Sequence, residues 1–123
     1  MRQRKSIESY RDLEVWQRGI DLVERTYQIT DHFPAQEKYG LTAQLRRAVV
    51  SISSNIAEGW GYSSRKQYIH FLEQARSSLL EVETQFIIAE RLGYITASAL
   101  EDMLRDTTTE SKMLLSLMRA LRR

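Results

Sequence analysis

A single proline, Pro34, interrupts a chain of 123 residues in which the apolar side chains otherwise recur at steps of three and four. That spacing places the apolar residues on one face of an α-helix, and proline is the residue that most strongly disrupts a helix. No alternation of apolar and polar residues competes with this pattern. The sequence therefore predicts an all-α protein built from long helices.

Helix-ending residues divide the first half of the chain into two helices. Asp12 is a suitable N-cap for the first helix, which ends at Phe33-Pro34 because the residue before a proline avoids the helical region. The second helix spans about residues 38–58. Gly59 and Gly61 are expected to end it.

Capping residues mark two further helices in the second half. Ser64 forms a capping box with Gln67 and begins the third helix, which Gly93 ends. The fourth begins near Thr96 or Ser98 and continues almost to the end of the chain. Short loops between helices of similar length favour antiparallel neighbours, so we expect an up-down-up-down antiparallel four-helix bundle.

Each helix carries one apolar stripe that is expected to face the core. In the first and second helices the stripes are Leu13, Trp16, Ile20, Val23 and Tyr27, and then Leu41, Leu45, Ala48, Val49, Ile52 and Ile56. In the third and fourth they are Tyr68, Leu72, Ala75, Leu79, Val82, Phe86 and Ala89, and then Leu100, Leu104, Leu114, Met118 and Leu121.

Two helices also carry a second apolar row, which a bundle core does not require. The rows are Val15, Leu22 and Ile29 in the first helix and Ala43, Val50 and Ala57 in the second. Either they widen the core face or they form an oligomer interface, since proteins that stay monomeric rarely expose long apolar rows. We favour the interface. Rows on two different helices suit a head-to-tail ring.

Composition narrows the class of protein. The chain has no cysteine, which excludes disulfide scaffolds, cysteine-ligated zinc, iron–sulfur clusters and thiol catalysis. No apolar run approaches the roughly 18 residues of a membrane span, and no signal-peptide pattern is present. We expect a cytoplasmic protein with one domain over residues 1–123, of which residues 1–11 form a loose N-terminal arm.

Residue patterns for catalysis or metal binding do not occur. A di-iron bundle needs two Glu-x-x-His pairs, but neither His32 nor His70 has a glutamate three residues before it. Gly59-Trp60-Gly61 resembles a phosphate loop but follows a helix and lacks the Gly-Lys-Ser/Thr ending. We therefore expect no catalytic residues, no metal site and no cofactor. Asn55 lies on the apolar side of its helix, where we expect it to fix helix register.

Basic pairs next to aromatic residues are the best candidates for a binding site. Cations at the start of a helix attract anions, and aromatic rings can stack on unpaired bases. Alternatively, the aromatic residues cap the core and the basic residues only solvate the surface. The candidate nucleic-acid-binding residues are Arg46, Arg47, Arg65 and Lys66, with Trp60 and Tyr62 as stacking residues.

Short motifs between residues 12 and 95 resemble, in order, those of a known family. They are Asp12-Leu13-Glu14-Val15-Trp16-Gln17, Phe33-Pro34 with Glu37, Tyr39-Gly40-Leu41, Gln44-Leu45-Arg46-Arg47-Ala48, Ser51-Ile52, Asn55-Ile56-Ala57-Glu58-Gly59, Phe71-Leu72 with Ala75, Ser78-Leu79, Glu81, Glu83 and Leu92-Gly93-Tyr94-Ile95. The family is that of the bacterial four-helix-bundle proteins encoded in intervening sequences of large-subunit (23S) ribosomal RNA genes. Accessory variability proteins of diversity-generating retroelements look like relatives on the same fold.

The resemblance implies a non-enzymatic bundle that assembles as a homopentamer and has a suspected role in binding RNA or DNA. The retroelement relatives also bind a reverse transcriptase. The net charge of this chain is only +2, which departs from those strongly basic relatives. Two functions are therefore expected: a nucleic-acid-binding module, or a protein-interaction scaffold for a partner such as a reverse transcriptase.

Overall fold

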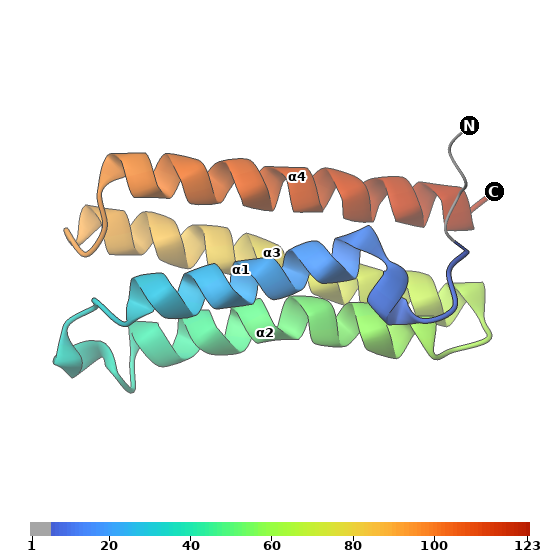
Figure 1. The fold of residues 1–123 in the computed structure, drawn as a ribbon, viewed down its shortest axis with the longest axis horizontal. Coiled ribbons are helices and arrows are strands. Elements are labelled where there is room, and N and C mark those ends of the chain that lie inside the picture. Colours follow the sequence, from blue (N-terminus) through green and yellow to red (C-terminus); the bar gives the residue numbers. More distant parts are fainter. Residues whose placement is uncertain (1–5) are drawn as a thin grey trace.

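Four long helices dominate the computed structural model, which describes residues 6–123 (Figure 1). No strand occurs in that part of the chain. The fold is the expected four-helix bundle. Its elements are the short 3-10 helices η1 (Tyr10–Asp12) and η2 (Ala35–Glu37) and the α-helices α1 (Glu14–Thr30), α2 (Leu41–Trp60), α3 (Arg65–Arg91) and α4 (Ala97–Leu121).

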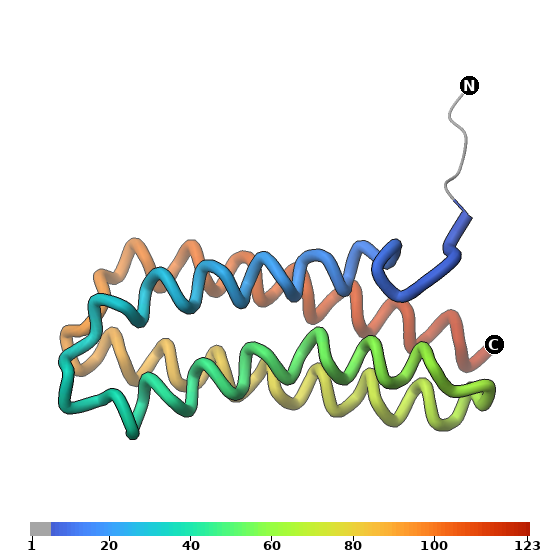
Figure 2. Tube along the Cα trace, turned by 60° about the horizontal axis from the view of Figure 1, so that its bottom comes forward, coloured from blue at the N-terminus to red at the C-terminus, as the bar shows by residue number. Residues whose placement is uncertain are grey.

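The connections alternate between the two ends of the bundle, as an up-down-up-down topology requires (Figures 1 and 2). The α1–α2 and α3–α4 connections lie at one end. The α2–α3 connection lies at the other, together with the start of α1 and the end of α4. Residues 60–65 are thereby brought to the same end as residues 119–123, although the whole of α3 and α4 separates them in sequence.

The stripes of α2 and α3 form the centre of the core, as predicted. Every stripe residue of these two helices is buried except Leu41 and Tyr68, which are half-buried against the same core. Complete burial of one large apolar side chain contributes about 1.5–3 kcal/mol. These two stripes therefore supply much of the free energy that holds the bundle together.

The prediction for α1 was wrong, because the helix turns its other apolar row inward. Val15 and Leu22 are 5% and 3% exposed, and Gly19, Thr26 and Thr30 are buried on the same face. The predicted stripe from Leu13 to Tyr27 is instead half-buried or exposed. Both rows have helical spacing, so the spacing alone did not decide which one faces the core.

Helix α4 also meets the core differently from the prediction. Its buried residues are Met103, Thr107, Glu110, Leu114 and Met118, whereas Leu100, Leu104 and Leu121 are half-buried. Leu114 and Met118 were predicted correctly. The middle of the helix therefore presents a threonine and a glutamate to the interior.

Helix ends agree with the sequence in α3 and α4. The Ser64 hydroxyl accepts a hydrogen bond from the Gln67 amide, and the Thr96 hydroxyl accepts one from the Ala99 amide, which selects Thr96 over Ser98 as the N-cap. Gly93 follows α3 with a φ of 80°, a conformation that favours glycine.

Two predicted helix ends differ in the structure. Asp12 is not the N-cap of α1. It is the last residue of η1, whose N-cap is Ser9, and its carboxylate accepts hydrogen bonds from the Glu8 and Ser9 amides. Gly59 lies inside α2, where a Cβ would be only 2.9 Å from the Phe71 Cβ and the Tyr68 Cδ1. Gly59 therefore permits close approach of α3 and does not end the helix.

The expected loose arm over residues 1–11 is only partly described. Residues 1–5 lie outside the described residues. Tyr10, however, belongs to η1, and its ring meets that of Trp16 edge-on with centroids 5.3 Å apart. The end of the arm is therefore folded against α1.

None of the helices formed by residues 6–123 combines the length and apolar character that crossing a bilayer demands.

Candidate functional site

Basic residues from two distant segments meet at the end of the bundle that carries the α2–α3 connection. Arg65 and Lys66 are exposed in the first turn of α3, and the Arg65 guanidinium donates a 3.0 Å hydrogen bond to the Arg123 carbonyl. Arg122 lies beside them and forms an ion pair of 3.1 Å with Glu73. We call Arg65, Lys66, Arg122 and Arg123 the basic end.

A shallow groove of about 500 Å³ crosses the basic end. It is lined by Lys66, Ile69, His70, Glu73 and Arg122. Arg122 was absent from the predicted site residues, although the antiparallel topology would have placed the end of the fourth helix beside the start of the third. Arg122 therefore lies in the same groove as Lys66, although its ion pair with Glu73 offsets its charge.

The two predicted stacking residues have different surroundings. Tyr62 is 51% exposed and stacks on Phe71, with ring centroids 5.2 Å apart and planes inclined by 19°. Trp60 is half-buried and meets Tyr68 edge-on at 6.4 Å. Trp60 therefore has the surroundings of a residue that caps the core, and Tyr62 is the ring more accessible to a base.

The other basic pair lies far from the basic end. Arg46 is roughly 20 Å of helix before the end of α2, at about 1.5 Å per residue. Its guanidinium bonds to the Asp31 carboxylate and the Thr30 hydroxyl, both at 2.9 Å, and lies 4.4 Å from the Tyr27 ring centroid. Arg47 is exposed. The structure does not bring the four predicted cations together, and Arg46 already has a structural partner.

An apolar groove runs along the outer side of α1 and α2. It has a volume of about 310 Å³ and is lined mainly by apolar side chains. Its residues are Tyr10, Trp16, Ile20, Val23, Val50, Ser53, Ser54 and Ala57. We call this surface the α1/α2 groove.

The predicted oligomer-interface residues divide into two groups. Val15 and Leu22 are buried within the subunit and cannot contact another copy, which corrects the prediction for the first helix. Ile29 is half-buried against the core. Val50 is 41% exposed, and Ala57 lines the α1/α2 groove with it. Ala43 is half-buried on the same helix.

A second exposed apolar surface lies on α3 and α4 and was not predicted. Leu80, Ile87, Ile88 and Leu115 are each between 38% and 43% exposed. Leu80 and Leu115 line a further hollow of about 480 Å³ between the two helices. The subunit thus presents different apolar surfaces on α1/α2 and on α3/α4.

Several residues of the sequence motifs have structural roles. Asn55 Nδ2 donates to the Ser51 carbonyl and hydroxyl, and the Ser51 and Ser78 hydroxyls are 2.9 Å apart across α2 and α3. Asn55 therefore acts structurally, as expected, through a serine pair that links the two helices.

A second polar contact joins two connections. The Tyr94 hydroxyl donates a 2.7 Å hydrogen bond to the Glu37 carboxylate, which also accepts one from the Leu41 amide. The bond from Tyr94, followed by that from Leu41, lowers the pKa of Glu37, and the same Tyr94–Glu37 bond raises the pKa of Tyr94. The first connection is thereby held against the third.

Possible catalytic groups are dispersed. Among residues 6–123, no three histidine or acidic side chains are grouped so as to hold a metal ion. Both histidines are exposed. Glu110 is the one described residue whose pKa is raised to about 8, chiefly by burial. It belongs to the core and not to the basic end.

Comparisons with known proteins agree with these structural observations. A family model described as "23S rRNA-intervening sequence protein" matches residues 11–116. A crystal structure of a protein with unknown function from the S23 ribosomal protein family from Bacteroides thetaiotaomicron is 25% identical to the chain. The match covers 85% of this chain and 95% of that chain, with a TM-score of 0.78. No curated protein matches the chain.

Proposed function

The chain belongs to the 23S rRNA-intervening sequence protein family, and on that premise we propose that it is a cytoplasmic, non-enzymatic, homo-oligomeric module that binds single-stranded RNA or DNA. The observation that carries the proposal is the basic end, where Arg65 and Lys66 from α3 meet Arg122 and Arg123, which follow α4. Binding of nucleic acid at this end requires no catalytic site.

The chemistry of the basic end suits phosphate groups. Arg65 donates to the main-chain oxygen of Arg123, the last residue of the sequence, and among the ion pairs of the described residues Lys66 has no carboxylate partner. Such cations bind phosphates with release of counterions, so affinity falls steeply with salt. The exposed Tyr62 ring adds a surface on which one base can stack without reading sequence.

Self-association would place several copies of the basic end in one assembly. The α1/α2 groove and the separate α3/α4 apolar surface suit a head-to-tail contact, in which one surface of each copy meets the other surface of the next. Such contacts form a ring when the rotation between neighbouring copies closes, and five copies is the number that the family resemblance implies. A ring repeats the basic end, and several weak sites on one flexible strand raise its overall affinity.

The nucleic-acid proposal is tested by fluorescence anisotropy with labelled single-stranded RNA and DNA at about 50 mM salt. We expect weak, sequence-tolerant binding that Arg65→Glu/Lys66→Glu reduces by at least tenfold. For single strands, each lost phosphate contact should make the negative slope of log K against log salt shallower by about 0.7. Tyr62→Ala should weaken binding further, whereas Trp60 is better left intact because it packs on Tyr68.

Arg46→Glu/Arg47→Glu is the matched control, with the same change of charge at the other basic pair. Because Arg46 is already bonded to Asp31, we expect this pair to contribute less than the basic end. Absence of binding, or equal effects of the two charge reversals, would refute the assignment to the basic end. The scaffold function would then be favoured.

Self-association is tested by light scattering at micromolar concentration. Val50→Asp places a charge in the exposed part of the α1/α2 groove and should dissociate the assembly with little change in helical content. Tyr39→Asp introduces the same charge at a side chain that is 87% exposed outside the groove, and it should leave the assembly intact. A monomeric parent protein would contradict the proposed ring.

A protein-interaction scaffold is the second candidate function, and the two apolar surfaces favour it. In this alternative a partner such as a reverse transcriptase occupies one of them, and the basic residues only solvate the surface. Isolation of the complex from cells, followed by sequencing of bound nucleic acid, separates the candidates. Bound RNA or DNA that Arg65→Glu/Lys66→Glu removes supports the first function, and a protein partner without nucleic acid supports the second.

A further inference from the structure

The middle of α4 places a carboxyl group in the core of the bundle. Glu110 is 0% exposed, and neither of its carboxylate oxygens has a hydrogen-bond partner among the described residues. An ionised carboxylate in such a place loses its hydration and gains nothing in return, so the neutral acid is favoured. In agreement, burial raises the pKa of Glu110 to about 8.

The neighbouring helices pack closely around this carboxyl group. Gly19 of α1 lies opposite, and a Cβ there would be 3.5 Å from Glu110 Oε2 and would collide with the Ser53 hydroxyl of α2. That hydroxyl donates to the Trp16 carbonyl at 3.1 Å and is therefore engaged elsewhere. The hydrogen atom of that hydroxyl is therefore not available to an ionised Glu110.

Two charged groups of α1 act on the pKa of Glu110 in opposite directions. Arg18 lowers the pKa of Glu110 and Glu14 raises it, and both effects are smaller than that of burial. Arg18 is itself 3.4 Å from Glu14, with which it forms an ion pair on the helix surface. Neither side chain makes a hydrogen bond to Glu110.

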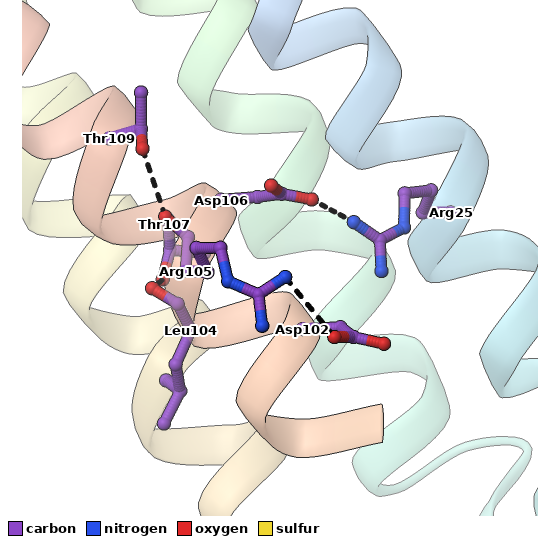
Figure 3. Close-up of polar contacts among 7 residues, drawn as sticks. All are labelled: Arg25, Asp102, Leu104, Arg105, Asp106, Thr107 and Thr109. Carbon is purple, nitrogen blue, oxygen red and sulfur yellow. Dashed lines mark hydrogen bonds and ion pairs between the residues drawn. The ribbon is translucent and has the colours of Figure 1, made fainter. Parts of the chain in front are cut away.

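The charged groups that reach α4 from other positions are also engaged. On α3, Arg76 donates to the Ser111 hydroxyl at 3.2 Å, and Glu83 accepts a 2.6 Å bond from the Thr107 hydroxyl. On α4 itself, Asp106 turns to α1 and forms an ion pair with Arg25 (Figure 3). The residue that α2 places near the site, Ser53, does not titrate.

The contact between α1 and α4, which we call the α1–α4 seam, is hollow on both sides of Glu110 along α4. One hollow of about 240 Å³ is lined by Arg18, Asp21, Leu22, Arg25 and Asp106. The other, of about 320 Å³, is lined by Leu13, Glu14, Val15, Met113, Ser116, Leu117 and Ala120. These hollows give water two short routes to the seam.

We propose that the α1–α4 seam is a pH-sensitive joint, which stays closed while the Glu110 carboxyl is protonated and opens when that carboxyl ionises. An ionised Glu110 needs water or a cation, and separation of α4 from α1 is the movement that supplies water. Opening exposes Met113 and Leu117, which are half-buried in the closed seam.

The direction of the pH effect follows from proton binding. The pKa of Glu110 is about 8 in the closed seam, against an ordinary value of 4.5 for a carboxyl group in water. Between these two pH values the closed state therefore binds one proton more than the open state. The closed state is therefore most favoured at low pH and loses stability as pH rises towards 8, above which the effect levels off. The opening constant should rise about a hundredfold between pH 6 and pH 9.

Amide hydrogen exchange between pH 6 and pH 9, corrected for the intrinsic pH dependence of exchange, tests the joint on the full chain. We expect the opening constant to rise for residues 103–118 of α4 and to change much less for α3. Glu110→Gln keeps the shape of the side chain without its charge and should remove this rise. Glu101→Gln makes the same change on the exposed face of α4 and should preserve it.

Glu110→Met provides a second variant without a titrating group, and it too should lack the rise. Carbon-13 shifts of labelled glutamate carboxyls report the titration of Glu110 directly. The proposal is overturned if Glu110 titrates near its ordinary pKa of 4.5, if the rise persists in Glu110→Gln or Glu110→Met, or if all four helices open together.

Discussion

The α2–α3 contact and the α1–α4 seam show two ways of packing helices in one bundle. Between α2 and α3 most of the apolar stripe residues are buried, Gly59 lets the helices approach closely, and the Ser51–Ser78 pair connects them. The α1–α4 seam contains two hollows and a buried carboxyl without a partner. The α2–α3 contact is closely packed, whereas the hollows at the α1–α4 seam leave space for the two helices to move.

The comparison also separates structural from functional motifs. Asn55, Gly59 and Ser78 belong to the motifs that resemble the family, and all three act in the α2–α3 contact. The basic end and the α1/α2 groove lie outside that contact. A motif match in this chain therefore identifies the fold more directly than it identifies a binding site.

The largest effect on either contact is expected from Leu22→Asp in the α1–α4 seam. The sequence-based prediction that the second apolar row of the first helix forms an oligomer interface would place this change there. Leu22 is, however, only 3% exposed and lies inside the subunit. Burying a charge there should lower the free energy of unfolding by roughly 3 kcal/mol or more. Urea denaturation followed by circular dichroism measures the loss, and a fully folded variant with unchanged stability would mean that α1 is rotated from its described position.

Leu79→Ala should weaken the α2–α3 side by about 2–5 kcal/mol through lost transfer free energy and a new cavity. Leu79 is completely buried on α3. Its matched control is Leu80→Ala, since the neighbouring Leu80 is 42% exposed and should lose far less. A change below half a kcal/mol at Leu79 in a denaturant titration would show that this stripe does not form the core.

Gly59→Ala tests how closely α2 and α3 must approach. The added Cβ would meet the Phe71 Cβ and the Tyr68 Cδ1 at 2.9 Å, so the helices have to separate. Overpacking of this kind costs about 1–3 kcal/mol. The comparison is with Gly61→Ala, where the closest atom would be a carbonyl oxygen at 3.3 Å and the cost in thermal denaturation should be smaller. Equal costs at both glycines would contradict the close-approach role.

The smallest effect is expected for the Arg25–Asp106 pair across the α1–α4 seam (Figure 3). Both side chains are more than a third exposed, at 36% and 41%, so solvent screens their attraction. A double-mutant cycle with Arg25→Met and Asp106→Asn should give a coupling free energy below about 1 kcal/mol. A coupling of several kcal/mol would show that this pair, and not apolar packing, holds the seam.

The sequence by itself determined the number of helices, most of their ends and the core faces of α2 and α3. The apolar spacing from Leu72 to Ala89 predicts the core face of α3, and the cap at Ser64 fixes where that helix begins. It also indicated the structural role of Asn55. These features depend on residues close together in the chain, which is the range over which sequence patterns act.

Tertiary structure alone decided the rotation of α1, the burial of Glu110 and the assembly of the basic end. Periodicity fixes the angles between side chains around one helix axis, but α1 carries two apolar rows, and only packing against α2 and α4 selects the one that contains Val15 and Leu22. Arg122 reaches the basic end because α4 returns to the start of α3. Such placements arise from the shapes of all four helices together, so no local pattern specifies them.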